Sequence, residues 1–379
     1  MNSDSWREGI FDEVVRLNRG FDLPNYKMQD GPFPVVASSS IKGTHAEFRV
    51  KGPGVVTGRS GTLGVVQYVT GEYWPLNTTL YAKDFRGNDP RFVYYFLTTM
   101  RLENYNAGAG VPTLNQNHLQ KLSVLIPDVA LQSKIAGVLG AFDDLIGINV
   151  KQRELVHKLA DELYREWFVR QRFPGYRTVN VTKGVPDTWT TKRMGEFCTL
   201  KRGYDLPNSA VRPGEYPVVA STSIKTHHDD FKVEPPVVTT GRSGSLGEVL
   251  LVNERAWPLN TSLYVKDFHG NSTYLVFYTL KNMHLENFNS GAGVPTLNRN
   301  HLSGISIAVP DSNLQKEFDN EVSVHWRKIE VLDETIKKLT TLRNLLLYRL
   351  VSGRLSIEDL SICCSETGKE KDLQELVHA

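Results

Sequence analysis

Apolar positions follow two different spacings along the chain. Short apolar runs bounded by Gly, Pro, Asn or Ser predict strands at 34–37, 54–57 and 65–68. In two other stretches, apolar residues recur every three or four positions, which predicts amphipathic helices. The pattern therefore predicts mixed α+β segments that alternate with long helices.

Each long helix is marked by its apolar series. The first series is Leu131, Ile135, Leu139, Phe142, Ile146, Leu155, Leu159, Leu163 and Trp167. The second is Leu314, Phe318, Val322, Ile329, Leu332, Ile336, Leu339, Leu342, Leu346 and Leu350. Asp128 is the expected cap of the first helix, Phe173-Pro174-Gly175 its expected end, and Ser352-Gly353 ends the second. About 40 residues give a length of about 60 Å, and two such helices are expected to pack as an antiparallel, coiled-coil-like pair with the leucines in the core.

The chain contains a long internal repeat. Arg19-Gly-Phe-Asp-Leu-Pro-Asn25 recurs 183 positions later as Arg202-Gly-Tyr-Asp-Leu-Pro-Asn208. Aligned at this offset without a gap, 19–128 and 202–311 are identical at 63 of 110 positions. A period this long indicates a duplicated domain rather than a solenoid, and the identity predicts that both copies do the same job.

Five segments follow from the repeat and the helices. The copies begin near Trp6 and Trp189 and end at Pro-Asp pairs, and in the first copy Asp89-Pro90 is expected to open a short helix that reaches about Leu102. The predicted boundaries are a first domain at 1–128, a central helix at 129–175, a second domain at 176–311, a C-terminal helix at 312–356 and a weakly ordered tail at 357–379.

Composition adds bounds but no function. The 379 residues suffice for two or three domains, and a formal net charge of +2 argues neither for nor against nucleic-acid binding. Three cysteines (Cys198, Cys363 and Cys364) suggest no disulfide framework. The sequence offers no secretory start and no apolar stretch long enough to span a membrane, so a cytoplasmic protein is expected.

The motifs of catalysis are missing. Glu234-Pro-Pro-Val237 has the wrong first and last residues for the tetrad that holds a flipped adenine in a methyltransferase. The glycine-rich segment 58–64 matches neither a dinucleotide fold nor an ATP-binding loop. His227-His228 aligns with Thr44-His45, so only one histidine of the pair is repeated and no metal is expected. The chain is predicted to be non-catalytic and to bind no cofactor.

Arginine between glycines is the first candidate for DNA contact. Thr57-Gly-Arg-Ser-Gly61 and its copy place Arg59 and Arg242 where the backbone can approach a ligand closely. Arginine reads guanine O6 and N7 bidentately and also grips phosphate. The alternative is a tight turn whose arginine makes an internal salt bridge.

Other repeated loops carry hydroxyl, amide and basic groups. Serine and lysine suit phosphate, whereas asparagine and glutamine suit adenine; each loop could equally be a solvated turn. The candidate DNA-contacting residues of the first copy are Ser38, Ser40, Lys42, Thr57, Arg59, Ser60, Asn77, Thr78, Asn115, Gln116, Asn117 and His118. Those of the second copy are Ser221, Ser223, Lys225, Thr240, Arg242, Ser243, Asn260, Thr261, Asn298, Arg299, Asn300 and His301. Gln116 and Arg299 differ inside an otherwise matching loop, so any difference between half-sites is expected there first.

The chain resembles the specificity subunits of type I restriction-modification systems over about 6–355. Ile135-Ala-Gly-Val-Leu-Gly-Ala-Phe-Asp-Asp-Leu-Ile146 is similar to the start of the family's central conserved helix, and Leu163-Tyr-Arg-Glu-Trp-Phe-Val169 with Arg172-Phe-Pro-Gly175 to its end. Leu342-Arg-Asn-Leu-Leu-Leu347 through Leu350-Val-Ser-Gly353 is similar to the C-terminal conserved helix. The resemblance implies two target-recognition domains that bind a bipartite double-stranded DNA target. It also implies two modification subunits docked on the helices, which use S-adenosylmethionine, and restriction subunits that could add ATP- and Mg²⁺-dependent cleavage.

The near-identity of the copies sharpens this expectation. An antiparallel helix pair would relate the domains by a pseudo-twofold axis, so equal domains would read equal half-sites in inverted orientation. We expect a palindromic or near-palindromic interrupted target, with a full site of at most about 17 base pairs. Two alternatives remain: a modification-only or antirestriction role without a nuclease, and a duplicated glycan-binding scaffold, whose affinity would respond little to salt.

Overall fold

The computed structural model describes residues 5–108, 110–291 and 293–357, which form two compact units. Unit 1 comprises Met1–Val150 and Glu334–Ala379, and unit 2 comprises Lys151–Asp333. The two unit boundaries, after 150 and after 333, are 183 positions apart, which is the repeat offset. Each unit therefore contains one copy of the repeat, the first part of the helix that follows it and the last part of the other long helix.

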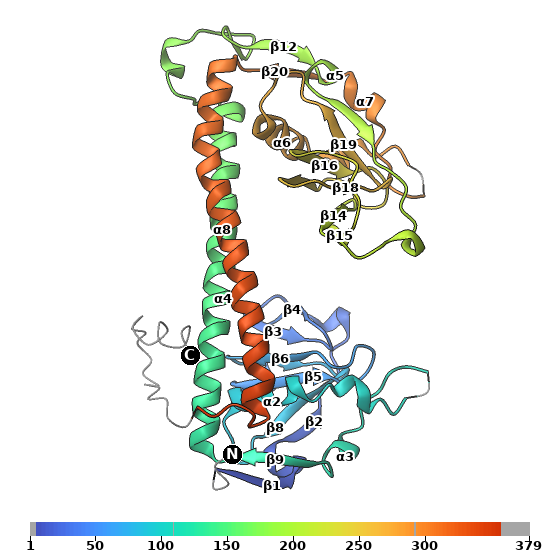
Figure 1. Cartoon of the computed structure of the whole chain (residues 1–379), viewed down its shortest axis with the longest axis vertical. Helices are drawn as coiled ribbons and strands as arrows, with labels where there is room; N and C mark the ends of the chain where they lie inside the picture. The colour runs from blue at the N-terminus through green and yellow to red at the C-terminus, as the bar shows by residue number, and fades with distance from the viewer. Residues whose placement is uncertain (1–4, 109, 292, 358–379) are drawn as a thin grey trace. The chain divides into compact units, whose positions relative to one another are not determined.

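Unit 1 is an α+β domain built on a four-stranded antiparallel sheet of order β2-β8-β5-β6. Helix α2 packs against β5 and β6 of this sheet, as Figure 1 shows. A second sheet has the order β4-β3-β7, in which β3 and β7 are parallel, and β1 pairs with β9. The bounds are β1 Trp6–Ile10, α1 Phe11–Val14, β2 Arg16–Arg19, η1 Asn25–Lys27, β3 Phe33–Val36, β4 Ile41–His45, β5 Gly54–Gly58, β6 Val66–Val69, β7 Trp74–Pro75, β8 Thr79–Asp84, α2 Pro90–Thr99, η2 Leu102–Tyr105, α3 Gln116–Leu119, β9 Ser123–Pro127 and α4 Val129–Tyr164.

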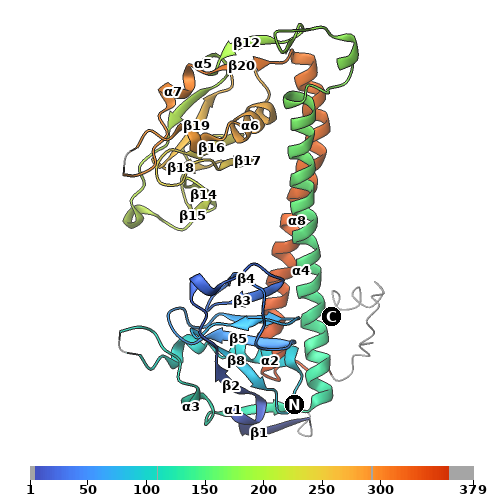
Figure 2. The same cartoon turned by 180° about the vertical axis from the view of Figure 1, so that it is seen from behind.

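Unit 2 repeats this topology, with sheets of order β13-β19-β16-β17 and β15-β14-β18 and a β12-β20 pair. Figure 2 shows the same elements from behind. After α4 come η3 Arg165–Val169, η4 Tyr176–Thr178, β10 Val181–Thr182 and β11 Val185–Pro186. The repeated elements are β12 Thr190–Arg193, α5 Met194–Phe197, β13 Thr199–Arg202, η5 Asn208–Ala210, β14 Tyr216–Val219, β15 Ile224–His228, β16 Val237–Gly241, β17 Val249–Val252, β18 Trp257–Pro258, β19 Ser262–Asp267, α6 Thr273–Asn282, η6 Leu285–Phe288, α7 Arg299–Ser303, β20 Ser306–Val309 and α8 Ser312–Val351.

The predicted short elements are confirmed with small shifts. Strands β3, β5 and β6 occupy the three predicted positions. Asp89 caps α2 by accepting hydrogen bonds from the backbone N–H groups of Arg91 and Phe92, and such a cap contributes about 1 kcal/mol. Helix α2 ends at Thr99 rather than near Leu102, because Arg101 adopts a left-handed backbone conformation with φ of 50°.

The long helices belong to the cores of the units. In unit 1, Ile135, Leu139 and Phe142 of α4 are buried in one cluster with Phe92 and Phe96 of α2 and with apolar residues of α8 (Leu347, Leu350 and Val351). In unit 2, the equivalent cluster contains Phe318 and Val322 of α8 together with α4 residues such as Tyr164. Each helix thus contributes to the core of both units.

A buried glutamine joins each domain to the helix that follows it. The side chain of Gln132 is fully buried; its Oε1 accepts from the backbone N–H of Asp89 at 3.0 Å. Its Nε2 donates to Asn88 Oδ1 at 2.7 Å and to the carbonyl of Pro127 at 2.9 Å. Gln315 makes the same three bonds in unit 2, to Ser272, Asn271 and Pro310. The three bonds tie the first turn of the helix to the start of α2 or α6 and to the preceding strand.

The helix segments of unit 2 run antiparallel. Arg153 Nη1 lies 2.8 Å from Asp333 Oδ1, the rings of His157 and Trp326 are 5.8 Å apart, and those of Tyr164 and Phe318 are 6.2 Å apart. In unit 1, Arg343 of α8 donates to Asp143 of α4 at 2.6 Å. In unit 2, residue numbers that increase along α4 (153, 157 and 164) are paired with residue numbers that decrease along α8 (333, 326 and 318), as expected for antiparallel helices.

Two details of the helix prediction are wrong. Leu155 and Leu159 of α4 are 59% and 58% exposed and Leu342 of α8 is 46% exposed, although we expected all three in the core. In unit 2, Ala160 and Tyr164 of α4 are buried instead, together with Trp167 of η3, which was predicted in the core. The rings of Tyr164 and Trp167 pack against Phe318 of α8. The α-helical run ends at Tyr164 and closes with a π turn at Arg165–Val169, before the expected stop at 173–175.

The expected tail lies outside the described residues, with one exception. Ile357 is described and buried in the core of unit 1, whereas Cys363 and Cys364 fall outside the described part. Within the described ranges, no helix combines the length and hydrophobicity that a membrane span requires.

Replacing Gln132 by methionine tests the helix joint. The change keeps the volume but leaves a partly buried N–H of Asp89 and a buried carbonyl of Pro127 without their partner, so we expect a loss of about 3 kcal/mol in the free energy of unfolding. Chemical denaturation followed by circular dichroism measures it. Gln152, which is exposed on the same helix, provides the control: Gln152→Met should change stability by less than about 0.5 kcal/mol. Equal stability of the two variants would contradict a structural role for the joint.

Candidate DNA-recognition surface

Three loops of unit 1 form one hydrogen-bonded surface. The backbone N–H groups of Arg59 and Ser60, which follow β5, both donate to the carbonyl of Thr78 at 2.8 and 3.1 Å. Leu114 N donates to the carbonyl of Arg59 at 2.8 Å, and Gly61 N to that of Pro112 at 3.0 Å. Segments 59–61, 77–78 and 112–114, which are far apart in the sequence, therefore lie together. We call this surface, with the adjoining residues 20–22 and 38–42, the recognition edge.

The recognition edge is duplicated in unit 2. Arg242 N and Ser243 N donate to the carbonyl of Thr261 at 2.8 and 3.1 Å, and Leu297 N donates to the carbonyl of Arg242 at 2.8 Å. The second edge thus consists of 203–205, 221–225, 242–244, 260–261 and 295–297. Backbone bonds of equal length in both copies indicate that the same scaffold holds the same side chains.

Arg59 and Arg242 are partly exposed on this surface. One guanidinium N–H of Arg59 donates to the backbone carbonyl of Asn77 at 3.3 Å, and Arg242 donates to that of Asn260 at 3.1 Å. A guanidinium has five N–H donors, so this bond orients the side chain and leaves most of its donors for an outside partner. Among the described residues, neither arginine forms an ion pair with a carboxylate, which disfavours the internal salt bridge.

Two of the expected contact residues are part of the framework. Thr57 and Thr240 are 0% and 1% exposed, and their hydroxyls donate to the carbonyls of Val65 at 3.1 Å and Glu248 at 2.9 Å. Their place inside a fully buried strand keeps them from reaching DNA, which corrects the expectation for both. They support the loop that carries the arginine.

The serine-lysine loop divides into inner and outer residues. The hydroxyl of Ser38 lies within hydrogen-bond distance of the carbonyls of Ser60 and Thr78, at 2.9 and 3.0 Å. Ser221 has the same position against Ser243 and Thr261, so each serine hydroxyl connects two other segments of its edge by hydrogen bonds. Ser40 and Lys42, like Ser223 and Lys225, are exposed. Lys42 Nζ donates to Asn25 Oδ1 at 2.6 Å and Lys225 Nζ to Asn208 Oδ1 at 2.9 Å, and both ammonium groups retain other N–H donors.

The asparagine-rich loop holds itself in shape. Asn115 caps α3 by accepting from Asn117 N at 3.0 Å, and Asn298 does the same for α7 through Asn300 N. The outward residues are Asn117 and His118 in unit 1 and Asn300 and His301 in unit 2. Gln116 is half-buried with a shielded Oε1, whereas Arg299 in its place is exposed. The one difference between the loops therefore gives unit 2 an additional cation.

Asn77 and Thr78 sit at the centre of the edge, half-buried like Asn260 and Thr261. The carbonyl of Thr78 receives two backbone N–H bonds, and the side-chain amide of Asn77 donates to Asp22 Oδ1. Asn260 donates to Asp205 Oδ1 in the same way. Sequence reasoning did not assign a role to Asp22 or Asp205, although their repetition inside Arg-Gly-aromatic-Asp-Leu-Pro-Asn was a signal that could have identified them.

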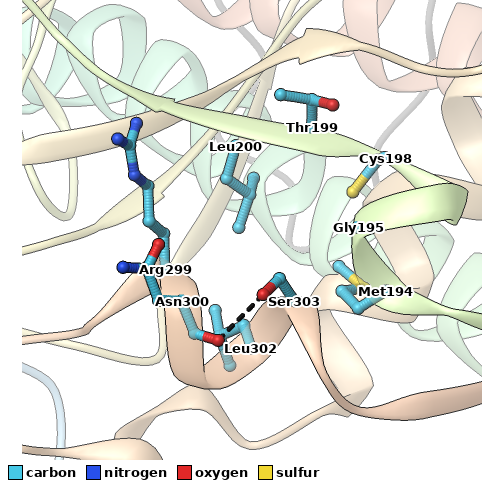
Figure 3. Close-up of a pocket in the computed structure, with 9 residues that line it drawn as sticks. All are labelled: Met194, Gly195, Cys198, Thr199, Leu200, Arg299, Asn300, Leu302 and Ser303. Carbon is cyan, nitrogen blue, oxygen red and sulfur yellow. Dashed lines mark hydrogen bonds between the residues drawn. The ribbon is translucent and has the colours of Figure 1, made fainter.

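A pocket of about 330 Å³ adjoins the second asparagine-rich loop. It is lined by Met194, Gly195, Cys198, Thr199, Leu200, Arg299, Asn300, Leu302 and Ser303. Figure 3 shows Arg299 on the opposite side of this pocket from the sulfur of Cys198. Burial raises the pKa of the Cys198 thiol to about 12, so the thiol is neutral near pH 7 and is a poor nucleophile. The hydroxyl of Ser303 donates to the carbonyl of Asn300 at 2.8 Å, so this serine is not paired with a base.

The repeated histidine is also structural. His45 and His228 are 5% and 3% exposed, and their rings pack against Trp74 and Trp257 at 5.1 and 5.2 Å. Each Nδ1 lies within hydrogen-bond distance of a backbone N–H, that of Gln29 or Arg212. Among the residues that the structure describes, no group of three or more His, Cys, Asp or Glu side chains could hold a metal ion.

Comparison with known proteins assigns both copies to one family. The sequence model of the type I restriction modification DNA specificity domain matches residues 5–158 and again 186–344. The two matches together cover most of the chain and follow the duplication.

Individual relatives agree with the family match. The specificity subunit of type I restriction enzyme MjaIX from Methanocaldococcus jannaschii is 24% identical over an alignment of 301 residues, and the match covers 71% of this chain and 70% of that protein. The specificity subunit of type I restriction enzyme EcoprrI from Escherichia coli is 28% identical over 139 residues, 35% of each chain.

A solved structure shares the fold. The type I restriction-modification S subunit from M. genitalium matches with a TM-score of 0.61 at 17% sequence identity, over 92% of this chain and 97% of that chain. Together with the duplicated recognition edge, these matches show that the chain belongs to the family of type I restriction-modification specificity subunits and is a non-catalytic component that recognises a DNA target.

Proposed function

We propose that this chain binds a bipartite, interrupted double-stranded DNA target, with one half on each recognition edge. The observation that carries the proposal is the duplication of the edge itself, with Arg59 and Arg242 held by the same backbone bonds. Exposed Lys42 and Lys225 suit phosphate contacts beside them. Nearly equal edges would read nearly equal half-sites, so the proposed target is palindromic or near-palindromic.

The pseudo-twofold relation is part of the same proposal. Each unit combines one copy with the first part of its own helix and the last part of the other, and the unit boundaries repeat at the 183-residue offset. A long antiparallel, coiled-coil-like helix pair would present the two edges in inverted orientation and would set the spacer between the half-sites.

The helices are also the proposed docking site for two modification subunits. Leu155 and Leu159, one turn apart on α4, are both more than half exposed, and neighbouring exposed leucines are a feature of protein interfaces. The partners would supply S-adenosylmethionine-dependent methylation, and restriction subunits with ATP and Mg²⁺ could be added. In this proposal the chain binds none of these cofactors and acts with its partners on DNA in the cytoplasm.

Methylation mapping tests the target. The chain is co-expressed with its modification subunit, and methylated adenines are located across the host genome by single-molecule sequencing. We expect one interrupted motif whose halves are inverted copies, each with one modified adenine. Two unrelated halves would contradict the palindromic target while leaving the bipartite one.

Arginine variants test the recognition edges. We expect Arg59→Ala to weaken binding to one half-site and Arg242→Ala to weaken binding to the other, each by about 1–3 kcal/mol if the arginine reads a guanine. Arg59→Lys keeps the charge but loses the bidentate geometry, so it should recover little of the loss. Fluorescence anisotropy with target duplexes measures the affinities. Arg16→Ala, at the opposite end of β2 from the edge, should bind like the parent; a similar loss there would point to charge alone.

Polar variants of α4 test the docking site. Leu155→Ser with Leu159→Ser should reduce co-purification of the modification subunit at least tenfold, because an apolar contact of two leucines is lost. DNA binding by the free chain should stay unchanged, since neither residue lies on a recognition edge. Lys151→Ser with Lys158→Ser, exposed on the same helix, provides the control. Full assembly with the leucine variant would exclude this surface as the docking site.

A further inference from the structure

Each recognition edge carries an exposed carboxylate beside its central asparagine. Asp22 and Asp205 are exposed, and the side chain of Asp205 retains 73% of its accessible surface. Each accepts one hydrogen bond through Oδ1, from the amide of Asn77 or Asn260. A carboxylate has about four acceptor positions, so most of its capacity faces outward. Asp205 also lies 3.8 Å from Arg202 Nη2, a loose and exposed ion pair.

The backbone beneath these carboxylates is held rigidly. Gly20 N donates to the carbonyl of Thr79 at 3.1 Å and Phe21 N to that of Pro75 at 2.8 Å. A Cβ at Gly20 would meet the carbonyl oxygen of Leu76 at 2.2 Å, and one at Gly203 would meet that of Leu259 at the same distance. Both glycines therefore permit a close backbone approach that a side chain would prevent. The approach places the following aspartate in a fixed position, as a base-reading group requires.

A carboxylate is an unusual group for a DNA-binding surface. Duplex DNA carries one negative charge per about 1.7 Å of its axis, so an aspartate that faced phosphate would weaken binding. It becomes favourable where it accepts a hydrogen bond from the exocyclic amino group of a base. In the major groove these groups are cytosine N4 and adenine N6.

We propose that Asp22 and Asp205 are specificity-determining residues that each accept a hydrogen bond from the N4 amino group of a cytosine, one in each half-site. The inference rests on the proposed function and names part of what each edge reads. Cytosine is favoured over adenine because adenine presents its N7 acceptor beside N6, which repels a carboxylate, whereas cytosine N4 is the only polar group of cytosine in the groove.

The neighbouring arginine fits the same base pair. Arg59 contacts Asn77 through the backbone carbonyl, and Asp22 contacts the side chain of the same residue. Arg242, Asn260 and Asp205 repeat the arrangement. A cationic donor and an anionic acceptor, both hydrogen-bonded to one asparagine, complement the guanine O6/N7 and cytosine N4 groups of a G·C pair or of adjacent pairs.

The competing role for Asp22 is purely positional. It could orient Asn77, and through it Arg59, without touching DNA. Substitution of the aspartate alone would weaken binding under either role, so a test must change the protein and the base together. A cycle of both changes isolates the direct contact.

The experiment uses the full chain with its modification subunits and a duplex of the mapped target. In one series of duplexes, each cytosine position of the half-sites is replaced in turn by 2-pyrimidinone, which lacks only the N4 amino group, and each replacement is made in both halves. In a second series, each adenine position is replaced in the same way by purine, which lacks N6. Affinities for the parent and for Asp22→Ala with Asp205→Ala are measured at fixed salt. Changing both halves and both residues removes the ambiguity of orientation on a palindrome.

We expect the parent to bind one 2-pyrimidinone duplex about 5- to 150-fold more weakly at each substituted half than the natural target. The Asp22→Ala, Asp205→Ala variant should bind this 2-pyrimidinone duplex and the natural target equally. Asp22→Asn with Asp205→Asn, which keeps an oxygen for the Asn amides, should show weaker discrimination than the parent and covers the case in which the alanine variant does not fold. Asp30→Ala, an exposed aspartate before the start of β3, should discriminate like the parent.

Three results would overturn the inference: equal binding of all 2-pyrimidinone duplexes by the parent, unchanged discrimination by the double variant, or coupling that appears only with purine. The second would assign the aspartates a positional role. Absence of any selected target for the parent is a different outcome, because it would overturn the proposed function first.

Discussion

The buried glutamine at the start of each long helix is the constraint on which the rest of the molecule depends. The buried side chains of Gln132 and Gln315 each join three peptide or amide groups that are buried or partly buried, and an unmade bond there would cost about 1–3 kcal/mol. The bonds fix the direction in which the helix leaves its domain. The helices in turn supply buried residues to the cores of both units.

The recognition edge shows how a fold rich in loops can still present a fixed surface. Its segments come from five places in the sequence. Backbone hydrogen bonds to Thr78 or Thr261 and hydroxyl bonds from Ser38 or Ser221 join three of them. The other two are attached by the backbone bond of Leu114 or Leu297 to the carbonyl of the arginine and by the side-chain bond of the asparagine to the aspartate. Thr57 and Thr240 are buried next to the arginine-bearing loop, and their hydroxyls donate to the carbonyls of Val65 and Glu248. Such a surface needs little ordering when it meets a ligand, so less binding free energy is lost.

Duplication accounts for both the likeness and the differences of the two edges. Arg59 and Arg242, and Asp22 and Asp205, have matching partners, whereas Gln116 and Arg299 differ in burial and in charge. Two nearly equal surfaces are what the proposed target with inverted halves requires. The added cation at Arg299 is the feature by which the halves could come to differ.

The sequence by itself determined the repeat, its ungapped offset, the α+β class and the caps at Asp89 and Asp128, because these depend on neighbours along the chain. It also singled out the loops of the recognition edge. Only the tertiary structure decided which of their residues face outward: Thr57 is buried and Lys42 is exposed. Helical spacing alone placed Leu155 and Leu159 in the core, but the aromatic residues of α8 turn a different face of α4 inward. Local patterns fix periodicity and turns, whereas burial is set by contacts between segments that the sequence keeps far apart.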